Sequence, residues 1–230
     1  MTRILFICHG NICRSPTAEF MLRDLVKRAG LEGEFVIDSA AAHGDETGSP
    51  VYPPARRLLG EHGIDCSGKT ARLLRREDYD RYDLLIGMDE ANLRDMRRLF
   101  GADTRGKLHS MLEYAGRPHD AVADPWYTRD FERCWRDLAE GCQGLLESIS
   151  GVVTLDFSAC GSVPALYGEL RRKLAWQDWY GENLDALYDV LTGLPHKGGR
   201  FIFLMPSAAA PDKVRAYAEK LRRVFAEAGY

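Results

Sequence analysis

Short apolar runs alternate with helical patterns along the first two thirds of the chain, and this alternation limits the possible folds more than any other feature. Strands that alternate with helices pair in parallel, and the crossover helices cover both faces of the sheet. The sequence therefore predicts an α/β fold. The expected strands are residues 3–8, 35–40, 82–88 and 107–111, and the expected helices are residues 15–29, 55–62, 91–100 and 131–150.

The pattern starts again near residue 150, with predicted strands at 152–157 and 200–205 and a predicted helix at 212–228. A chain of 230 residues is long enough for two small domains. We therefore expect domains at residues 1–150 and 151–230, joined without a linker rich in Pro, Gly or Ser. Residues 1–150 carry a net charge of −4, and residues 151–230 carry a net charge of +1.

Cysteine usage and net charge exclude several classes of protein. The six cysteines form no Cys-x-x-Cys pair, so neither a disulfide framework nor a zinc site is expected, and nothing indicates another metal or a cofactor. A net charge of −3 gives no reason to expect direct binding to nucleic acid or to a membrane. The apolar run from Ile4 to Cys8 is too short for a signal peptide or a membrane span, so we expect a cytoplasmic protein.

A cysteine at the end of the first predicted strand is followed by a six-residue loop that ends in an arginine and then a helix start, Ser15-Pro16. Ser15 is predicted to cap this helix with Pro16 at its first position. The loop N–H groups from His9 to Arg14, the helix N-terminus and the guanidinium can together hold one phosphate. The same positive field favours a thiolate on Cys8, which is therefore a candidate nucleophile.

The segment Ile-Cys-His-Gly-Asn-Ile-Cys-Arg-Ser-Pro-Thr-Ala-Glu at residues 7–19 resembles the signature of the low-molecular-weight protein tyrosine phosphatases. The likeness extends over residues 3–149 and includes segments 38–40, 52–56, 87–93 and 124–127. It implies a flavodoxin-like four-stranded parallel sheet and hydrolysis of phosphotyrosine in proteins through a phosphocysteine. In that mechanism Cys8 attacks phosphorus while Arg14 binds the phosphate. Asp124 protonates the leaving phenol and then acts as the base.

The resemblance also assigns roles around the loop. It implies that Asn11, Ser15 and Ser39 hold the loop in shape and that Trp126 and Tyr127 line the entrance. The implied substrate-binding residues are His9, Gly10, Asn11, Ile12, Cys13, Ser15, Trp126 and Tyr127.

Two departures and three alternatives accompany this resemblance. Residues 44–47 are acidic or small where many relatives have an aromatic wall, and Lys69 stands where relatives often have His. Arsenate reduction is disfavoured because residues 76–100 contain no cysteine. Phosphoarginine hydrolysis stays an alternative, although Ile12 in place of Thr favours phosphotyrosine. Cys13 is either a resolving thiol for an oxidised Cys8 or a small packed residue.

The second half contains an acidic stretch without Lys or Arg between Lys173 and Lys197, in which Glu182, Asp185 and Asp189 are predicted to share one helical face. Its segment 179–193 resembles barstar, the intracellular inhibitor of the ribonuclease barnase, and the likeness covers residues 152–228. The resemblance implies a small α/β domain with a two- or three-stranded parallel sheet.

The barstar resemblance also implies a partner-binding surface. Its implied contact residues are Trp179, Asp185 and Asp189. The expected partner of the acidic helix at 182–189 is a basic ribonuclease or another cationic protein. Two further readings stay open: the protein could be primarily a ribonuclease antidote, or the acidic helix could dock near Arg14 and inhibit the first domain.

Overall fold

The computed structural model describes residues 1–174, 181–193 and 200–230. The chain divides into two compact units, Met1–Ile149 and Ser150–Tyr230, and each is described by itself. No helix in these described ranges combines the length and the hydrophobicity that crossing a membrane requires.

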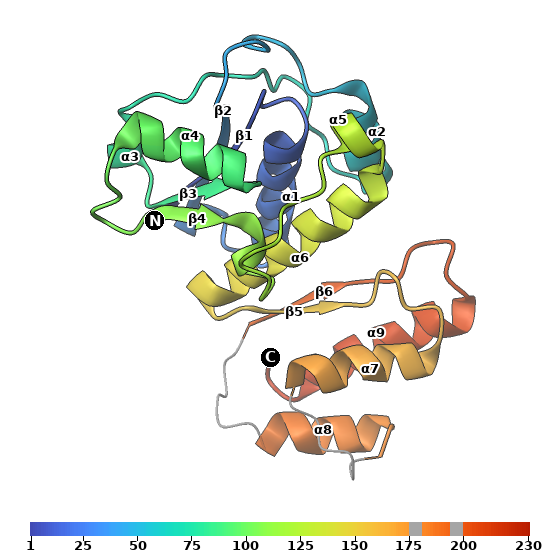
Figure 1. The fold of residues 1–230 in the computed structure, drawn as a ribbon. Coiled ribbons are helices and arrows are strands. Elements are labelled where there is room, and N and C mark those ends of the chain that lie inside the picture. The colour runs from blue at the N-terminus through green and yellow to red at the C-terminus, as the bar shows by residue number, and fades with distance from the viewer. Residues whose placement is uncertain (175–180, 194–199) are drawn as a thin grey trace. The chain divides into compact units, whose positions relative to one another are not determined.

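The first unit, described throughout, contains a four-stranded parallel sheet in the order β2-β1-β3-β4 (Figure 1). This order is that of a flavodoxin-like doubly wound sheet and confirms the predicted fold class. Parallel register places the carboxyl ends of the strands at one edge, where Cys8 pairs with Ala41 and Ile7 pairs with Gly87. The strands are β1 (Thr2–Cys8), β2 (Phe35–Ala41), β3 (Leu84–Gly87) and β4 (Leu108–Ser110).

Helices cover both faces of this sheet, as predicted. Side chains alternate along β1, so Leu5 and Ile7 share one face and pack against Met96. The fully buried Ile4 and Phe6 point to the opposite face. Helices α1 (Arg14–Arg28) and α6 (Phe131–Ser150) lie over that face (Figure 1). The helices are α1 (Arg14–Arg28), α2 (Pro53–Glu61), α3 (Asp78–Arg81), α4 (Glu90–Phe100), α5 (Pro125–Thr128) and α6 (Phe131–Ser150), with short 3₁₀ turns at η1 (Glu32–Glu34) and η2 (Met111–Glu113).

The start of α1 differs from the prediction. The helix begins at Arg14 with Cys13 at the N-cap position, and no side chain caps it. The Ser15 hydroxyl lies inside the first turn and contacts Cys8 and Asn11 instead. The predicted cap was wrong because two partners from outside the helix compete for this hydroxyl.

The second unit pairs β5 (Val153–Asp156) with β6 (Phe201–Leu204) in parallel, and among its described residues the sheet has these two strands. Helices α7 (Val163–Leu174), α8 (Leu184–Gly193) and α9 (Asp212–Glu227) enclose one core with the sheet. Phe157, Tyr167 and Phe225 are the largest fully buried side chains of that core. A small α/β domain with a two- or three-stranded parallel sheet was predicted for this half, and the two-stranded sheet of the described residues confirms this prediction.

Candidate active site

The loop between β1 and α1 lies at the carboxyl edge of the sheet, where ligands bind in folds of this class. Asn11 adopts a left-handed conformation with φ of 56°, which Asn tolerates better than most residues. Gly10 lies close to a neighbouring segment: a Cβ there would lie 3.1 Å from Cγ of Glu46, so a larger residue would require the Glu46 side chain to shift. The backbone N–H of Tyr52 donates to the Ile12 carbonyl at 2.7 Å and anchors the middle of the loop.

A buried chain of hydrogen bonds runs from the first strand to the second. Cys8 Sγ and Ser15 Oγ are 3.0 Å apart, and Asn11 Nδ2 donates to Ser15 Oγ at 2.9 Å. The same amide nitrogen donates to Ser39 Oγ at 2.7 Å. Asn11, Ser15 and Ser39 are at most 1% exposed, so their side chains lie behind the loop. The side chains of Asn11 and Ser15 do not line the cleft. Asn11 and Ser15 were predicted to contact the substrate. Because their side chains lie behind the loop, only their backbone N–H groups can do so.

Arg14 is held between two carboxylates. Its Nη1 lies 2.6 Å from Asp89 Oδ2, and its Nη2 lies 2.7 Å from Asp124 Oδ2. Burial by itself would lower the pKa of Arg14, but the negative charges of Cys8, Asp124 and Asp89 outweigh it and raise that pKa above the usual value. The guanidinium is therefore a fixed cation beside the thiol of Cys8, with the geometry to bind two oxygens of one anion.

Asp124 stands at the N-cap of α5, where Pro125 occupies the first helical position. Its Oδ1 accepts a hydrogen bond from the backbone N–H of Trp126 at 3.0 Å. Its Oδ2 is the atom that contacts Arg14, so the carboxylate is oriented through both oxygens. The aromatic side chains that follow are exposed, Trp126 by 54% and Tyr127 by 83%, although large aromatics are usually covered.

These side chains converge on one cleft of about 420 Å³. Cys8, Arg14 and Asp124 all line it, as do Trp126 and Tyr127. The remaining predicted residues that line it are His9, Gly10, Ile12 and Cys13. The structure therefore brings together a thiol, a buried cation and a carboxylate, which is the set of groups that nucleophilic displacement at a phosphate requires.

One wall of the cleft was not predicted in detail. The rings of His9 and His43 stack with centroids 4.3 Å apart, and His43 Nε2 lies 3.0 Å from Asp95 Oδ2. Asp45 and Glu46 line the same side, where the sequence placed acidic and small residues instead of an aromatic wall.

Cys13 lines the cleft but packs partly against the apolar cluster around Val51 and Ala55. Burial, followed by the negative charges of Cys8 and Asp124, raises the pKa of Cys13 to about 12. Its thiol is therefore neutral near pH 7. This favours the packing role among the two that the sequence left open.

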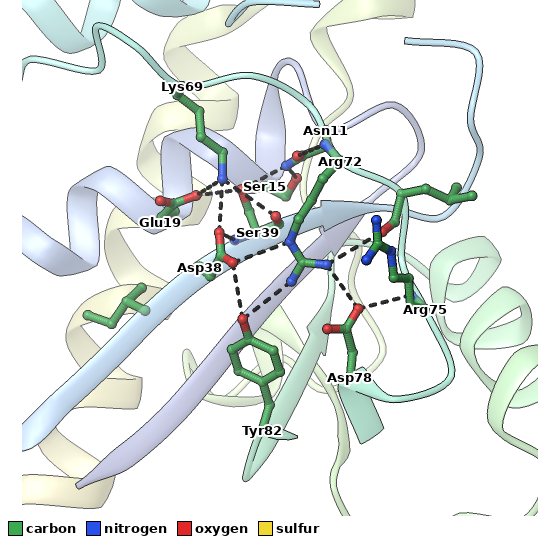
Figure 2. A network of polar contacts seen from close by, with 12 residues as sticks. Asn11, Ser15, Glu19, Asp38, Ser39, Lys69, Arg72, Arg75, Asp78 and Tyr82 are labelled. Carbon is green, nitrogen blue, oxygen red and sulfur yellow. Dashed lines mark hydrogen bonds and ion pairs between the residues drawn. The ribbon is translucent and has the colours of Figure 1, made fainter. Parts of the chain in front are cut away.

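Several residues of the site were given no role in the prediction from the sequence. Asp89 follows β3 and meets Arg14 only because parallel strands end at the same edge. Behind the loop, Glu19 and Lys69 are joined by an Oε2–Nζ contact of 2.6 Å, and Arg72 joins the same network (Figure 2). Glu19 lies four residues after Ser15, on the same face of α1, which is the one sequence clue to its position.

The predicted partner surface of the second unit is only partly present. Asp185, Tyr188 and Asp189 are exposed on α8, above the buried Leu187, Val190 and Leu191. Glu182 does not share this helical face. The helix starts after Asn183, whose Oδ1 accepts a hydrogen bond from the Ala186 N–H at 2.8 Å, so Glu182 precedes the helix. The Glu182 carboxylate pairs with Arg171 at 2.9 Å. Trp179 lies outside the described residues.

Comparison with known proteins divides the chain in a similar way. The family model for low molecular weight phosphotyrosine protein phosphatase matches residues 3–155, and the model for barstar, the barnase inhibitor, matches residues 151–230. Among curated proteins, the low molecular weight protein-tyrosine-phosphatase YfkJ of Bacillus subtilis is 38% identical over 65% of this chain and 96% of its own length. The low molecular weight phosphotyrosine protein phosphatase of Homo sapiens is 34% identical over 63% and 93%.

Solved structures are similar over the same part of the chain. The crystal structure of YfkJ superposes with a TM-score of 0.63 over 66% of this chain and 96% of that protein. The crystal structure of a Drosophila arginine phosphatase superposes with a TM-score of 0.60 at 27% identity, over 65% of this chain and 98% of that protein.

Proposed function

The chain belongs to the low molecular weight phosphotyrosine protein phosphatase family, and on that premise we propose that it hydrolyses phosphotyrosine in proteins through a phosphocysteine. The observation that carries the proposal is the convergence of Cys8, Arg14 and Asp124 in one cleft. Family membership supports a role as a phosphatase.

In the first step, Sγ of Cys8 forms a bond to phosphorus as the bond from phosphorus to the phenol oxygen breaks. The guanidinium of Arg14 and the N–H groups of the loop hold the non-bridging oxygens, where negative charge gathers in the transition state. The phosphate oxygens take the place of the Asp124 carboxylate on Arg14, which frees that carboxylate to turn toward the leaving group. The freed carboxylate takes up a proton from solvent and gives it to the leaving phenol oxygen.

In the second step, water attacks phosphorus, the bond from sulfur to phosphorus breaks, and Asp124 accepts the proton from the water. Sγ leaves as a thiolate, and the hydroxyl of Ser15 lies 3.0 Å away, where it can donate a hydrogen bond to the negative sulfur. The same hydrogen bond therefore serves the nucleophile in the first step and the leaving group in the second.

Aromatic side chains favour an aryl substrate over an alkyl one. Tyr52, Trp126 and Tyr127 line the cleft, and the rings of Tyr52 and Trp126 are 5.9 Å apart. A phosphotyrosine ring packed against these side chains would gain offset or edge-to-face contacts. Ile12 adds an apolar surface where the phosphate loop meets the cleft. Phosphoarginine is the alternative substrate, because the structure is similar to that of the Drosophila arginine phosphatase. The experiment below therefore includes a phosphoarginine peptide.

The test is steady-state turnover of p-nitrophenyl phosphate, a phosphotyrosine peptide and a phosphoarginine peptide, all with EDTA present. We expect turnover of the aryl phosphates, none with Cys8→Ser, and a decrease of about 10²- to 10⁴-fold in kcat with Asp124→Asn. A kcat/KM for phosphoarginine above that for phosphotyrosine would replace the proposed substrate. A folded wild-type protein without any turnover would reject the enzyme assignment.

For the second unit, we propose that the exposed face of α8 binds a cationic protein, with a basic ribonuclease as the first candidate. The match to the barstar family and the exposure of Asp185 and Asp189 support this proposal. Opposite charges speed such an association and make it sensitive to salt.

Calorimetric titration with purified barnase tests the binding. We expect Asp189→Ala to weaken it by about 10- to 100-fold, as for a central interface residue. Asp212→Ala is the matched control, because its side chain is 93% exposed on α9 and its loss changes the net charge equally. Equal affinities of the two variants would contradict a specific role for α8, and no binding at low salt would reject the ribonuclease.

A further inference from the structure

The segment that carries Asp124 is tied to the rest of the first unit just before it reaches the cleft. The Val122 N–H donates to the carbonyl of Met88, directly after β3, at 2.9 Å. The Ala123 N–H donates to Oδ2 of Asp137, on α6, at 3.1 Å. Each of the two residues that precede Asp124 therefore has an acceptor on a different part of the fold.

Asp137 is a buried carboxylate with a partner for each oxygen. Its side chain is 8% exposed, and Oδ1 accepts from Arg117 Nη2 at 2.9 Å while Oδ2 accepts from the Ala123 N–H. The same Arg117 nitrogen lies 2.7 Å from Oε2 of Glu140, on the next turn of α6. The guanidinium and the backbone N–H together hold the Asp137 carboxylate in one orientation.

Helix α6 gives Asp137 a fixed base. Leu138, Cys142 and Leu145 of this helix are completely buried. Cys142 Sγ also lies 3.6 Å from the carbonyl oxygen of Ala18 in α1. Close-packed side chains of this kind resist displacement. The position of Asp137 is therefore set by the core of the first unit and not by the segment that it holds.

Helix α5 cannot position Asp124 by itself. The helix has four residues, and its N-cap is Asp124, whose Oδ1 accepts from the Trp126 N–H. In the proposed mechanism the Asp124 carboxylate leaves Arg14 and turns toward the leaving oxygen, so the contacts of this side chain change during the reaction. The backbone of Asp124 must then be held from the preceding residues, which is where Asp137 binds.

We propose that Asp137 is a positioning residue for the proton transfer: by accepting from the Ala123 N–H, it fixes the backbone from which Asp124 reaches the leaving oxygen. Arg117 orients the Asp137 carboxylate for this task. The inference rests on the proposed role of Asp124 as the general acid. A displacement of about 1 Å in a reacting group can slow a reaction by about 100-fold, so a loosened segment should weaken proton transfer while the phosphate loop stays in place.

The test compares kcat/KM for two aryl phosphates in the full chain. The leaving oxygen of phenyl phosphate needs a proton, whereas 2,4-dinitrophenyl phosphate releases a stable anion that needs none. For Asp137→Asn we expect kcat/KM for phenyl phosphate to fall by about 10- to 100-fold and that for 2,4-dinitrophenyl phosphate to stay within about 2-fold. The amide keeps one acceptor oxygen where the carboxylate has two, so it cannot accept from both Arg117 and Ala123 in the same way. A folded Asp137→Asn protein in which both substrates change equally, or neither changes, overturns the inference.

Glu140→Gln is the matched control. Glu140 pairs with the same nitrogen of Arg117 and lies on the same helix, but its side chain is 58% exposed. This variant changes the net charge as Asp137→Asn does and leaves the Ala123 N–H with its acceptor. We expect the wild-type ratio of kcat/KM for the two substrates. A selective loss for phenyl phosphate as large as that of Asp137→Asn would assign the effect to charge near Arg117 and overturn the inference.

Asp124→Asn separates this inference from the mechanism on which it rests. It should show the same selective loss for phenyl phosphate, and Asp137→Asn added to it should cause little further loss, because no acid is left to position. If Asp124→Asn slowed both substrates equally, the proposed role of Asp124 would fail. If Asp124→Asn were selective and the losses of the two variants multiplied, Asp137 would act on something other than Asp124, and the inference would fail.

Arg117→Gln covers the case in which Asp137→Asn does not fold. The Arg117 side chain is 36% exposed, so its replacement is easier to tolerate than that of the buried Asp137. Loss of the guanidinium removes the partner of Asp137 Oδ1 and loosens the carboxylate, so kcat/KM for phenyl phosphate should fall selectively here too, by about 3- to 10-fold. An unchanged ratio for the two substrates in folded Arg117→Gln counts against the inference.

Discussion

Arg14 and Asp89, 75 residues apart in the chain, are joined by an Nη1–Oδ2 contact of 2.6 Å at the edge of the sheet. Each oxygen of Asp89 has its own partner. Oδ2 holds the guanidinium that faces the cleft, and Oδ1 accepts from the Asn92 N–H at 2.8 Å and caps α4. One carboxylate therefore connects the start of a helix to the orientation of the phosphate-binding cation.

Replacing Asp89 separates these two roles. Asn keeps an oxygen for the helix cap but presents an amide N–H₂ to Arg14, so Asp89→Asn should fold with nearly the wild-type Tm. We expect kcat/KM for p-nitrophenyl phosphate to fall by about 10- to 100-fold, because the guanidinium loses the partner that orients it. Asp89→Ala loses the cap as well, which should cost about 1 kcal/mol of stability. Wild-type kcat/KM in Asp89→Asn would show that Arg14 needs no such partner.

The six cysteines, all in described parts of the chain, should differ sharply in reactivity. Burial raises the pKa of five of them above the usual value, so their thiols are neutral at pH 7 and poor nucleophiles. These five are Cys13, Cys66, Cys134, Cys142 and Cys160. Cys8 instead lies beside the Arg14 cation and lines the cleft.

Mass spectrometry of peptides after reaction with less than one equivalent of iodoacetate at pH 7 checks this difference. We expect the label on Cys8, and inorganic phosphate should slow its addition by occupying the same cleft. Preferential labelling of any of the other five would mean that the loop does not activate its cysteine.

Asp38 should contribute to stability in a pH-dependent way. Burial alone would raise its pKa, but Lys69, the Ser39 N–H and Arg72 together lower it below the usual value. Unfolded Asp titrates near about 3.9, so the stabilisation is complete above that pH and is lost as the pH falls through the lower folded value. Asp38→Asn should therefore lower Tm at pH 7 and reduce the loss of Tm between pH 5 and pH 3.

Thermal unfolding of Asp80→Asn gives the matched control for Asp38. Asp80 also forms an ion pair, with Arg105 at 2.9 Å, but its side chain is 71% exposed, and such surface pairs contribute little. If the two variants showed the same acid dependence of Tm, the network around Lys69 would have no special electrostatic role.

Two helical glycines should respond oppositely to alanine. A Cβ at Gly144 in α6 would overlap the carbonyl oxygen of Tyr114, so Gly144→Ala should destabilise the first unit by about 1–3 kcal/mol or more. Gly168 in α7 is exposed, and a Cβ there would meet nothing within 4 Å. Gly168→Ala should stabilise the second unit by about 0.5–1 kcal/mol, because alanine favours helices. Denaturant unfolding checks both, and a neutral Gly144→Ala would mean that α6 can move away.

The sequence predicted those features that depend on local pattern. The alternation of apolar runs with helical patterns predicted the parallel sheet. The proximity of Cys8 and Arg14 was predicted because one short loop joins them. The catalytic role of Asp124 was predicted from the family resemblance alone, since an isolated Asp-Pro pair indicates only a turn. Its N-cap position on α5 was visible only in the structure.

What could not be predicted depends on which side chains meet across the fold. The pairing of Glu19 with Lys69 joins α1 to a segment 50 positions further along the chain, and no spacing rule describes such a contact. Ser15 was placed as a cap because the rule considers only the helix and not its outside partners. Glu182 was assigned to a helical face because the role of Asn183 in starting α8 was not recognised.

The central claim is that Cys8 carries the phosphoryl group between the two steps. Acid quenching of the wild-type protein during turnover of a phosphotyrosine peptide, followed by mass spectrometry of the peptide that contains residues 7–19, tests it most directly. We expect phosphate on Cys8 during turnover and none when Cys8→Ser is treated in the same way. Steady turnover with no phosphate on Cys8, in samples where a phosphocysteine standard survives the quench, would contradict the account.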